Sequence, residues 1–91
     1  MKTHKEILEA AMKIDHLQDE LMLNPEAGID NRDVTVENTT IEDIKDAVEY
    51  LFDEAFPRWF WTARNDGDVN ELRYNQEELR KVKDFKRNYL K

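Results

Sequence analysis

The sequence contains neither cysteine nor serine, and it has only two glycines and two prolines. Without cysteine there can be no disulfide, no thiolate zinc site and no cysteine nucleophile. Without serine there is no serine nucleophile, and two isolated glycines cannot form a glycine-rich phosphate loop. No other catalytic motif is present, so we expect a protein that is not an enzyme and that uses no cofactor.

Long apolar runs are also lacking. No stretch approaches the roughly 18 apolar residues that a membrane-spanning helix needs, and the N-terminal residues lack the long apolar run of a signal peptide. We therefore expect no membrane contact and a cytoplasmic location. The length of 91 residues suits one domain covering residues 1–91.

What the sequence does have is apolar residues spaced three and four apart, which is the period of one helix face. The first such segment predicts a helix over about residues 3–23. Thr3, followed three residues later by Glu6, resembles a capping box. Pro25 should end this helix, because the residue before a proline is pushed out of helical geometry.

Residues 24–40 lose this period and are rich in turn formers, so they predict a long irregular loop. Val34–Val36 has strand propensity and suggests one short extended piece within that loop. Loops of this length in a compact domain are usually functional or mobile.

The second helix is predicted over residues 41–56, with Thr40 as its N-cap. Pro57 interrupts this helix and can open a new one, so a short helix over about 57–64 should follow at an angle. Turn formers occupy 65–68, and the last helix should cover about 70–90. The expected fold is all-α: a small three-helix bundle with a long loop between helices 1 and 2.

Charge is unevenly distributed. Residues 41–56 hold six acids and one base, whereas residues 70–91 hold four acids and seven bases, within a chain of net charge −7. On the second helix, four carboxylates spaced by four, three and four residues fall within an arc of roughly 60°. These residues, here called the acidic stripe, are Glu42, Asp46, Glu49 and Asp53.

Three interpretations of the acidic stripe compete. The simplest is a solvated helix face. In the second, the stripe pairs within the chain or between copies with a basic stripe on the last helix, formed by Arg80, Lys83, Arg87 and Lys91. In the third, the carboxylates imitate nucleic-acid phosphates and occupy a basic groove on a partner, since neighbouring side chains lie roughly 5–6 Å apart.

The densest apolar chemistry is the segment 56–61. Trp59, Phe60 and Trp61 are consecutive, so on a helix at least one ring must point away from a single core face. Tryptophan and arginine are enriched at binding hot spots, which makes Arg58, Trp59 and Trp61 candidates for partner contact. The alternative is that these aromatic rings close one end of a small core.

Two sequence patterns resemble metal-binding sites only in part. The spacing of four oxygen-bearing side chains resembles that of a calcium-binding loop, but Glu71 occupies the position where the sharp turn needs glycine. These side chains are Asp66, Asp68, Asn70 and Glu77. A helix-capping turn is the favoured interpretation there. His4 and His16 lie on different faces of the first predicted helix, because twelve residues rotate by about 120°, and we expect both on the surface.

These patterns predict a non-enzymatic acidic binding protein, an inhibitor or regulator that docks its acidic stripe on a basic nucleic-acid-handling protein. Small acidic chains without cysteine are typical of phage-encoded antagonists of host defence or transcription, which would place the chain in the host cytoplasm. Direct nucleic-acid binding is disfavoured by the net negative charge. The alternative function is a structural or assembly component in which acidic and basic helices pair between copies.

Overall fold

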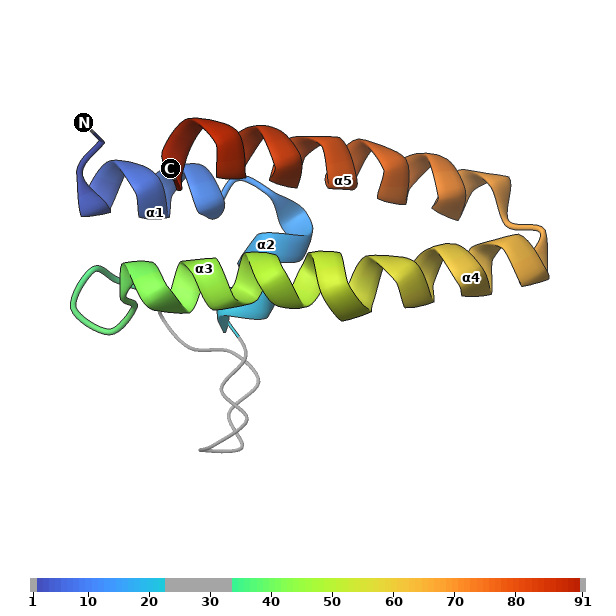
Figure 1. Cartoon of the computed structure of the whole chain (residues 1–91), viewed down its shortest axis with the longest axis horizontal. Helices are drawn as coiled ribbons and strands as arrows, with labels where there is room; N and C mark the ends of the chain where they lie inside the picture. The colour runs from blue at the N-terminus through green and yellow to red at the C-terminus, as the bar shows by residue number, and fades with distance from the viewer. Residues whose placement is uncertain (1, 23–33, 91) are drawn as a thin grey trace.

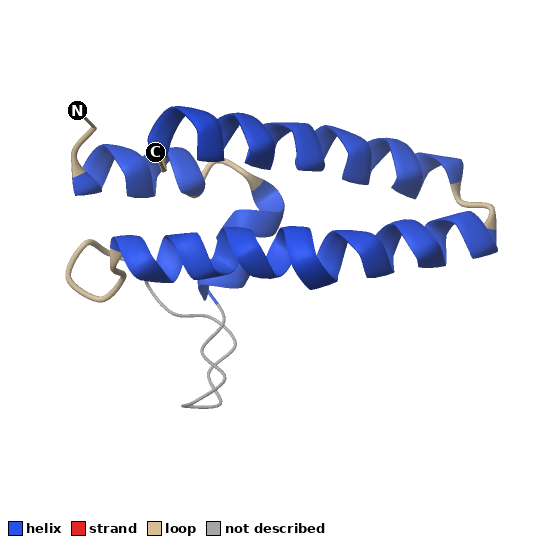
Figure 2. Ribbon diagram, viewed as in Figure 1, coloured by secondary structure: helices blue, strands red, loops and turns tan. Residues whose placement is uncertain are grey.

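The computed structural model describes residues 2–22 and 34–90, and all regular structure in them is helical (Figure 2). This confirms the predicted all-helical class for the described residues. The elements are α1 (His4–Ala11), α2 (Asp15–Met22), α3 (Ile41–Tyr50), the π-helix η1 (Leu51–Ala55), α4 (Phe56–Asp66) and α5 (Val69–Tyr89). The finer prediction of a three-helix bundle is not confirmed.

Two long helical stretches run antiparallel (Figure 1). One is the rod, our name for α3, η1 and α4, which follow one another without a break. The other is α5. The short helices α1 and α2 both pack against α3 and α5, whereas α4 and the first half of α5 extend beyond them as a hairpin. The fully buried core side chains include Leu17, Ile44, Leu51, Phe56 and Val82.

The predicted first helix is broken into two, which corrects the expectation of one helix over 3–23. Thr3 caps α1, its Oγ1 accepting the Glu6 N–H at 3.1 Å, which is one half of the predicted capping box. The Glu6 carboxylate accepts from the Thr3 hydroxyl instead of from the Thr3 backbone N–H. A turn after Ala11 then changes the direction of the chain, and α2 begins at Asp15. Ile14 within this turn is still buried, so the apolar period runs through the break without revealing it.

The predicted interruption at Pro57 is wrong, because the helical residues continue without a break to Asp66, whereas the predicted Pro-initiated helix is present as α4. Pro57 has no N–H, and in an α-helix its ring would clash with the carbonyl four residues earlier. The π turn just before it widens the helix, with the Phe56 N–H donating to the Leu51 carbonyl. Pro57 therefore lies in the first turn of α4, where its missing N–H is tolerated.

The π turn also keeps the buried face of the rod in phase. Ile44 and Ala63 are both buried, yet in an unbroken α-helix their nineteen-residue separation would leave them about 100° apart. A wide turn that absorbs one residue removes this offset. One side of the rod thus faces the core over its whole length, and the other side stays exposed.

The turns around the rod are closed by caps. Thr40 and Asp43 form a full capping box at the start of α3. Gly67, with a φ of 68°, ends α4, and Asp68 Oδ1 accepts the Glu71 N–H at 3.0 Å to start α5. The predicted helix-capping turn is therefore present. Within the predicted 24–40 loop, residues 34–40 form a turn rather than a strand, and residues 23–33 lie outside the described residues.

Candidate functional site

All four carboxylates of the acidic stripe are exposed on the rod. Glu42 forms an ion pair with Lys45 at 3.7 Å. Within the described part of the chain, no ion pair involves Asp46, Glu49 or Asp53. Asp53 lies in η1, so the α-helical period used to align the stripe applies to its first three members. Pairing of the stripe with α5 inside one chain is thus not observed among the described residues.

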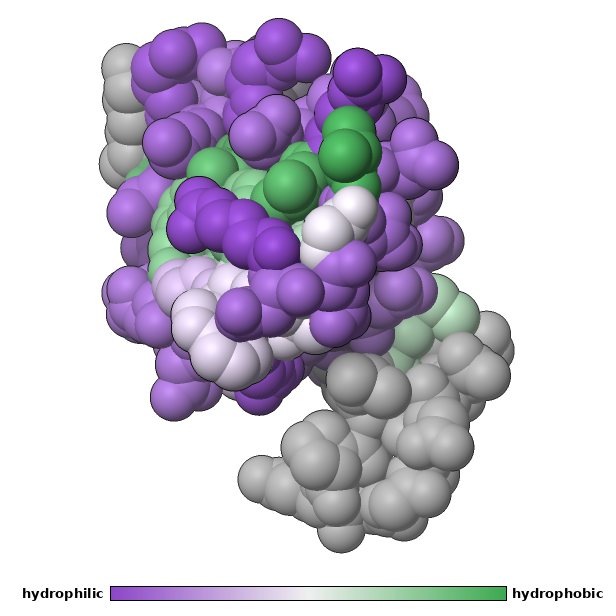
Figure 3. Space-filling model, turned by 90° about the vertical axis from the view of Figure 1, so that its right-hand side faces the viewer, coloured by the Kyte–Doolittle hydropathy of each residue, from purple (hydrophilic) through white to green (hydrophobic). Residues whose placement is uncertain are grey.

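The exposed side of the rod also carries Trp61, whose side chain is 68% exposed. This confirms that one of the consecutive aromatics points away from the core. Arg58 is exposed as well, and its Nη2 donates to Tyr50 Oη at 3.3 Å. Seen from the hairpin end, the surface is mostly hydrophilic around a small hydrophobic area (Figure 3).

Trp59 takes the opposite direction and is half-buried. Its indole stacks on the His16 ring, with centroids 4.3 Å apart, and meets Phe56 edge-on at 5.6 Å. The predicted partner-binding residues therefore divide into two groups. The acidic stripe, Arg58 and Trp61 are exposed on the rod, whereas Trp59 joins an inward aromatic cluster.

His16 is not the surface residue that the sequence predicted. It is half-buried; its Nε2 lies 2.9 Å from Asn75 Oδ1, and its backbone N–H donates to Glu78 Oε1 at 3.0 Å. His4 is also half-buried, with Nε2 at 2.7 Å from the Thr39 carbonyl oxygen. The histidines are half-buried because segments distant in sequence contact them, α5 in the case of His16 and the turn before α3 in the case of His4.

Asn75 and Glu78 were missed by sequence reasoning, although both are buried, with 3% and 1% of their surfaces exposed. A signal was available. Along the last helix, positions 72, 75, 78, 79, 82 and 85 keep the helical period of the buried face, so two polar residues sit in phase with the apolar ones. Glu78 Oε2 also forms an ion pair with Lys81 at 3.3 Å, and Oε1 accepts the His16 N–H at the start of α2.

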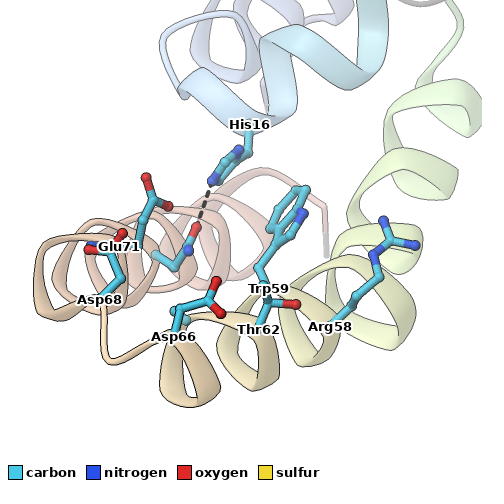
Figure 4. Close-up of a pocket in the computed structure, with 9 residues that line it drawn as sticks. His16, Arg58, Trp59, Thr62, Asp66, Asp68 and Glu71 are labelled. Carbon is cyan, nitrogen blue, oxygen red and sulfur yellow. Dashed lines mark hydrogen bonds between the residues drawn. The ribbon is translucent and has the colours of Figure 1, made fainter.

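A pocket of about 330 Å³ opens beside this cluster, between α4 and α5 (Figure 4). His16 reaches into it from the start of α2, Trp59 forms one wall, and three carboxylates gather near the α4–α5 turn. The lining residues are His16, Arg58, Trp59, Thr62, Ala63, Asp66, Asp68, Glu71 and Asn75.

Burial raises the pKa values of Tyr74 and Glu20, and neighbouring carboxylates add to both shifts. Burial raises the pKa of Tyr74 to about 12, helped by the negative charges of Glu78, Asp15 and Asp19. The Tyr74 hydroxyl also donates to Asp15 Oδ2 at 3.4 Å, which favours the protonated phenol. Burial, together with the charge of Asp19, raises the pKa of Glu20.

The predicted basic stripe lies on the exposed side of α5, apart from Lys91, which is outside the described residues. Arg87 pairs with Asp84 at 2.8 Å. A shallow groove of about 520 Å³ lies where this side meets η1, and Lys86 lies over the Phe52 ring at 5.5 Å. The groove is lined by Phe52, Lys83, Lys86, Arg87 and Leu90.

Over residues 2–22 and 34–90, no group of three or more histidine, aspartate or glutamate side chains is arranged to hold a metal ion. No described helix combines the length and apolar character needed to cross a membrane. Comparisons with protein-family models, curated proteins and solved structures found no match for this chain. Function is therefore inferred from the residues and their geometry.

Proposed function

We propose that this chain is a non-enzymatic acidic binding protein, an inhibitor or regulator that docks the acidic stripe on a basic surface of a nucleic-acid-handling protein. One observation carries the proposal: Asp46, Glu49 and Asp53 are exposed on one side of the rod and form no ion pair with any described residue. A phage-type antagonist that imitates nucleic acid is the specific form of this hypothesis.

The energetic reason is repulsion along the helix. Like charges three or four residues apart each cost roughly 0.2–0.5 kcal/mol of helix stability. Lys45 offsets this cost at Glu42, but the other three carboxylates have no such neighbour among the described residues. A basic partner would remove the repulsion and supply the attraction that speeds association.

Trp61 supports docking on the same side of the rod. A tryptophan that is 68% exposed is available to a partner without rearrangement of the fold, and tryptophan is enriched among residues that dominate interface energies. An interface over the exposed side of the rod would combine a charged half in α3 with an apolar anchor in α4.

The first test is thermal unfolding of the triple variant Asp46→Asn, Glu49→Gln, Asp53→Asn at low salt. If the carboxylates serve a partner, we expect unchanged stability or a gain of roughly 0.2–0.5 kcal/mol per relieved contact. A clearly lower melting temperature would show that these carboxylates stabilise the fold or an oligomer, and would exclude the mimicry hypothesis.

The second test measures binding of a labelled arginine-rich helical peptide by fluorescence anisotropy. The triple variant should bind more weakly and with less salt dependence than the parent chain. The matched control is Glu9→Gln, Glu37→Gln, Glu77→Gln, which removes the same charge from exposed positions that form no ion pair among the described residues. Equal loss in both triple variants would indicate net charge rather than a docking face.

A second candidate function is assembly through complementary faces of two copies. The observation in its favour is the groove on α5, where Lys83, Lys86 and Arg87 surround Phe52 and Leu90. Size-exclusion chromatography at low and high salt separates the candidates. A monomer at both salt concentrations favours the docking function, whereas an oligomer that dissociates with salt favours assembly.

A further inference from the structure

The pocket between α4 and α5 combines an aromatic wall with negative charge. The Trp59 indole is held in place by its stack on His16, 4.3 Å between centroids. On the other side of the opening, Asp66 and Glu71 are exposed, and no described residue forms an ion pair with either carboxylate. Asp68 also lines the opening, but its Oδ1 already caps α5.

Asn75 provides a buried polar group in the lining of this pocket. Its side chain is only 3% exposed, and its Oδ1 contacts His16 Nε2. Its Nδ2 donates to no described group. In the described residues, every side-chain nitrogen or oxygen that is sealed from solvent has a hydrogen-bond partner. The Nδ2 atom therefore keeps a small contact with solvent, and Asn75 is among the residues that line this pocket. A ligand with a carbonyl oxygen could accept its hydrogen bond.

Arg58 also lines the pocket and would repel a cation if it pointed at the carboxylates. In Figure 4 its guanidinium lies on the far side of Trp59 from Asp66, Asp68 and Glu71. Its Nη2 donates to Tyr50 Oη instead. The part of the pocket between Trp59 and the carboxylates is thus negative.

These groups define one ligand chemistry. His16 covers one face of the indole. A flat cation suits the remaining aromatic surface of Trp59, and its charge suits the two carboxylates. A guanidinium fits better than an ammonium, because it is planar and can bridge carboxylates with paired donors. The volume of about 330 Å³ is at the small end of ligand pockets, which run from roughly 300 to 1,000 Å³.

We propose that this pocket binds an arginine residue of a peptide segment. The guanidinium lies against Trp59 and pairs with Asp66 and Glu71, and a peptide carbonyl accepts the hydrogen bond from Asn75 Nδ2. This site is separate from the acidic stripe, and it does not depend on the proposed docking of that stripe.

The test uses the full chain with Trp61→Phe, which leaves Trp59 as the only tryptophan of the two in the sequence. The probe is Nα-acetyl-argininamide, and the comparison probe is Nα-acetyl-citrullinamide, which has nearly the same shape without the charge. We expect the arginine probe to change Trp59 fluorescence and to shift the Asn75 side-chain amide signals in an NMR spectrum. The citrulline probe should bind at least about tenfold more weakly, a difference of about 1.4 kcal/mol.

A charge variant locates the site. Asp66→Asn with Glu71→Gln should weaken binding of the arginine probe by about tenfold or more. The matched control, Glu9→Gln with Glu37→Gln, removes the same charge away from the pocket and should change binding less than twofold. The triple variant of the acidic stripe should also change it less than twofold, so failure of this site is distinguishable from failure of the proposed function.

Three outcomes overturn the proposal. They are no response to the arginine probe at concentrations of tens of millimolar, equal binding of the citrulline probe, and equal weakening in the pocket variant and its control. The first two are measured on the folded Trp61→Phe chain, so they hold even if the pocket variant fails to fold. A thermal melt of each variant establishes that it is folded before binding is compared.

Discussion

The rod and α5 are both long, lie side by side and bury one face, yet they reach this arrangement differently. The rod needs a π turn to keep its buried face towards the core, whereas α5 runs for 21 residues as a regular α-helix. The rod buries apolar side chains almost exclusively, while α5 places Asn75 and Glu78 in its buried face. Continuity of a helix and continuity of its buried face are therefore separate properties.

The largest effect should come from deleting one residue in each stretch. Deleting Glu54 from η1, in a chain that also carries Pro57→Ala so that no proline ring clashes inside the rejoined helix, removes the extra residue of the π turn. The helices α3 and α4 can then join as one α-helix with their buried faces in register. Deleting Glu77 from α5 rotates the rest of that helix by about 100°, which turns Val82 and Phe85 out of the core.

We expect the Glu77 deletion to lose more than about 4 kcal/mol, since it exposes several core side chains. The Glu54 deletion combined with Pro57→Ala should lose much less. Urea unfolding of the two proteins measures the difference. Equal losses would mean that the π turn is not a one-residue phase correction.

The buried carboxylate of α5 should give the next largest effect. Glu78→Leu leaves the His16 N–H at the start of α2 without its acceptor, and an unpaired buried donor costs about 1–3 kcal/mol. Glu78→Gln should cost less, because an amide oxygen can still accept that hydrogen bond. Amide exchange in α2 should rise most in the leucine variant.

The control for this prediction is Glu77→Gln, one position earlier and exposed. It should change the free energy of unfolding by less than about 0.5 kcal/mol. A leucine variant as stable as this control would show that α2 does not depend on Glu78 for its start.

The smallest effect concerns Tyr74, on the exposed edge of the same α5 face. Its folded-state pKa of about 12 lies above the ordinary value of 10.0, with burial as the main cause. The phenol therefore stabilises the fold fully below pH 10, and this contribution is lost as the pH rises towards 12. Solvent screens part of the effect, because Tyr74 is 39% exposed.

Tyr74→Phe should thus flatten the fall of stability over this alkaline range, measured by urea unfolding at several pH values. Tyr50→Phe is the matched control, since its hydroxyl only accepts from Arg58. An identical pH dependence in the parent and the Tyr74 variant would contradict the raised pKa of this phenol.

Sequence patterns by themselves determined the helical class and much of each boundary. The caps at Thr3, Thr40 and Asp68 are local, because each side chain accepts from an N–H three residues later. The last helix and the exposed acidic stripe follow from periodicity, which depends only on the geometry of one helix. The outward direction of one of the consecutive aromatic rings, which is that of Trp61, was predictable for the same reason.

Only the tertiary structure decided where helices break, bend or admit polar side chains. The start of α2 depends on Glu78, 62 positions beyond its partner His16. The π turn depends on the core that both α3 and α4 must face, and Pro57 alone suggested an end rather than a wide turn. The pocket at Trp59 joins side chains from α2, α4 and α5, so no single helical period could place them together. Local rules set the state of each segment, whereas these features arise from burial shared between segments.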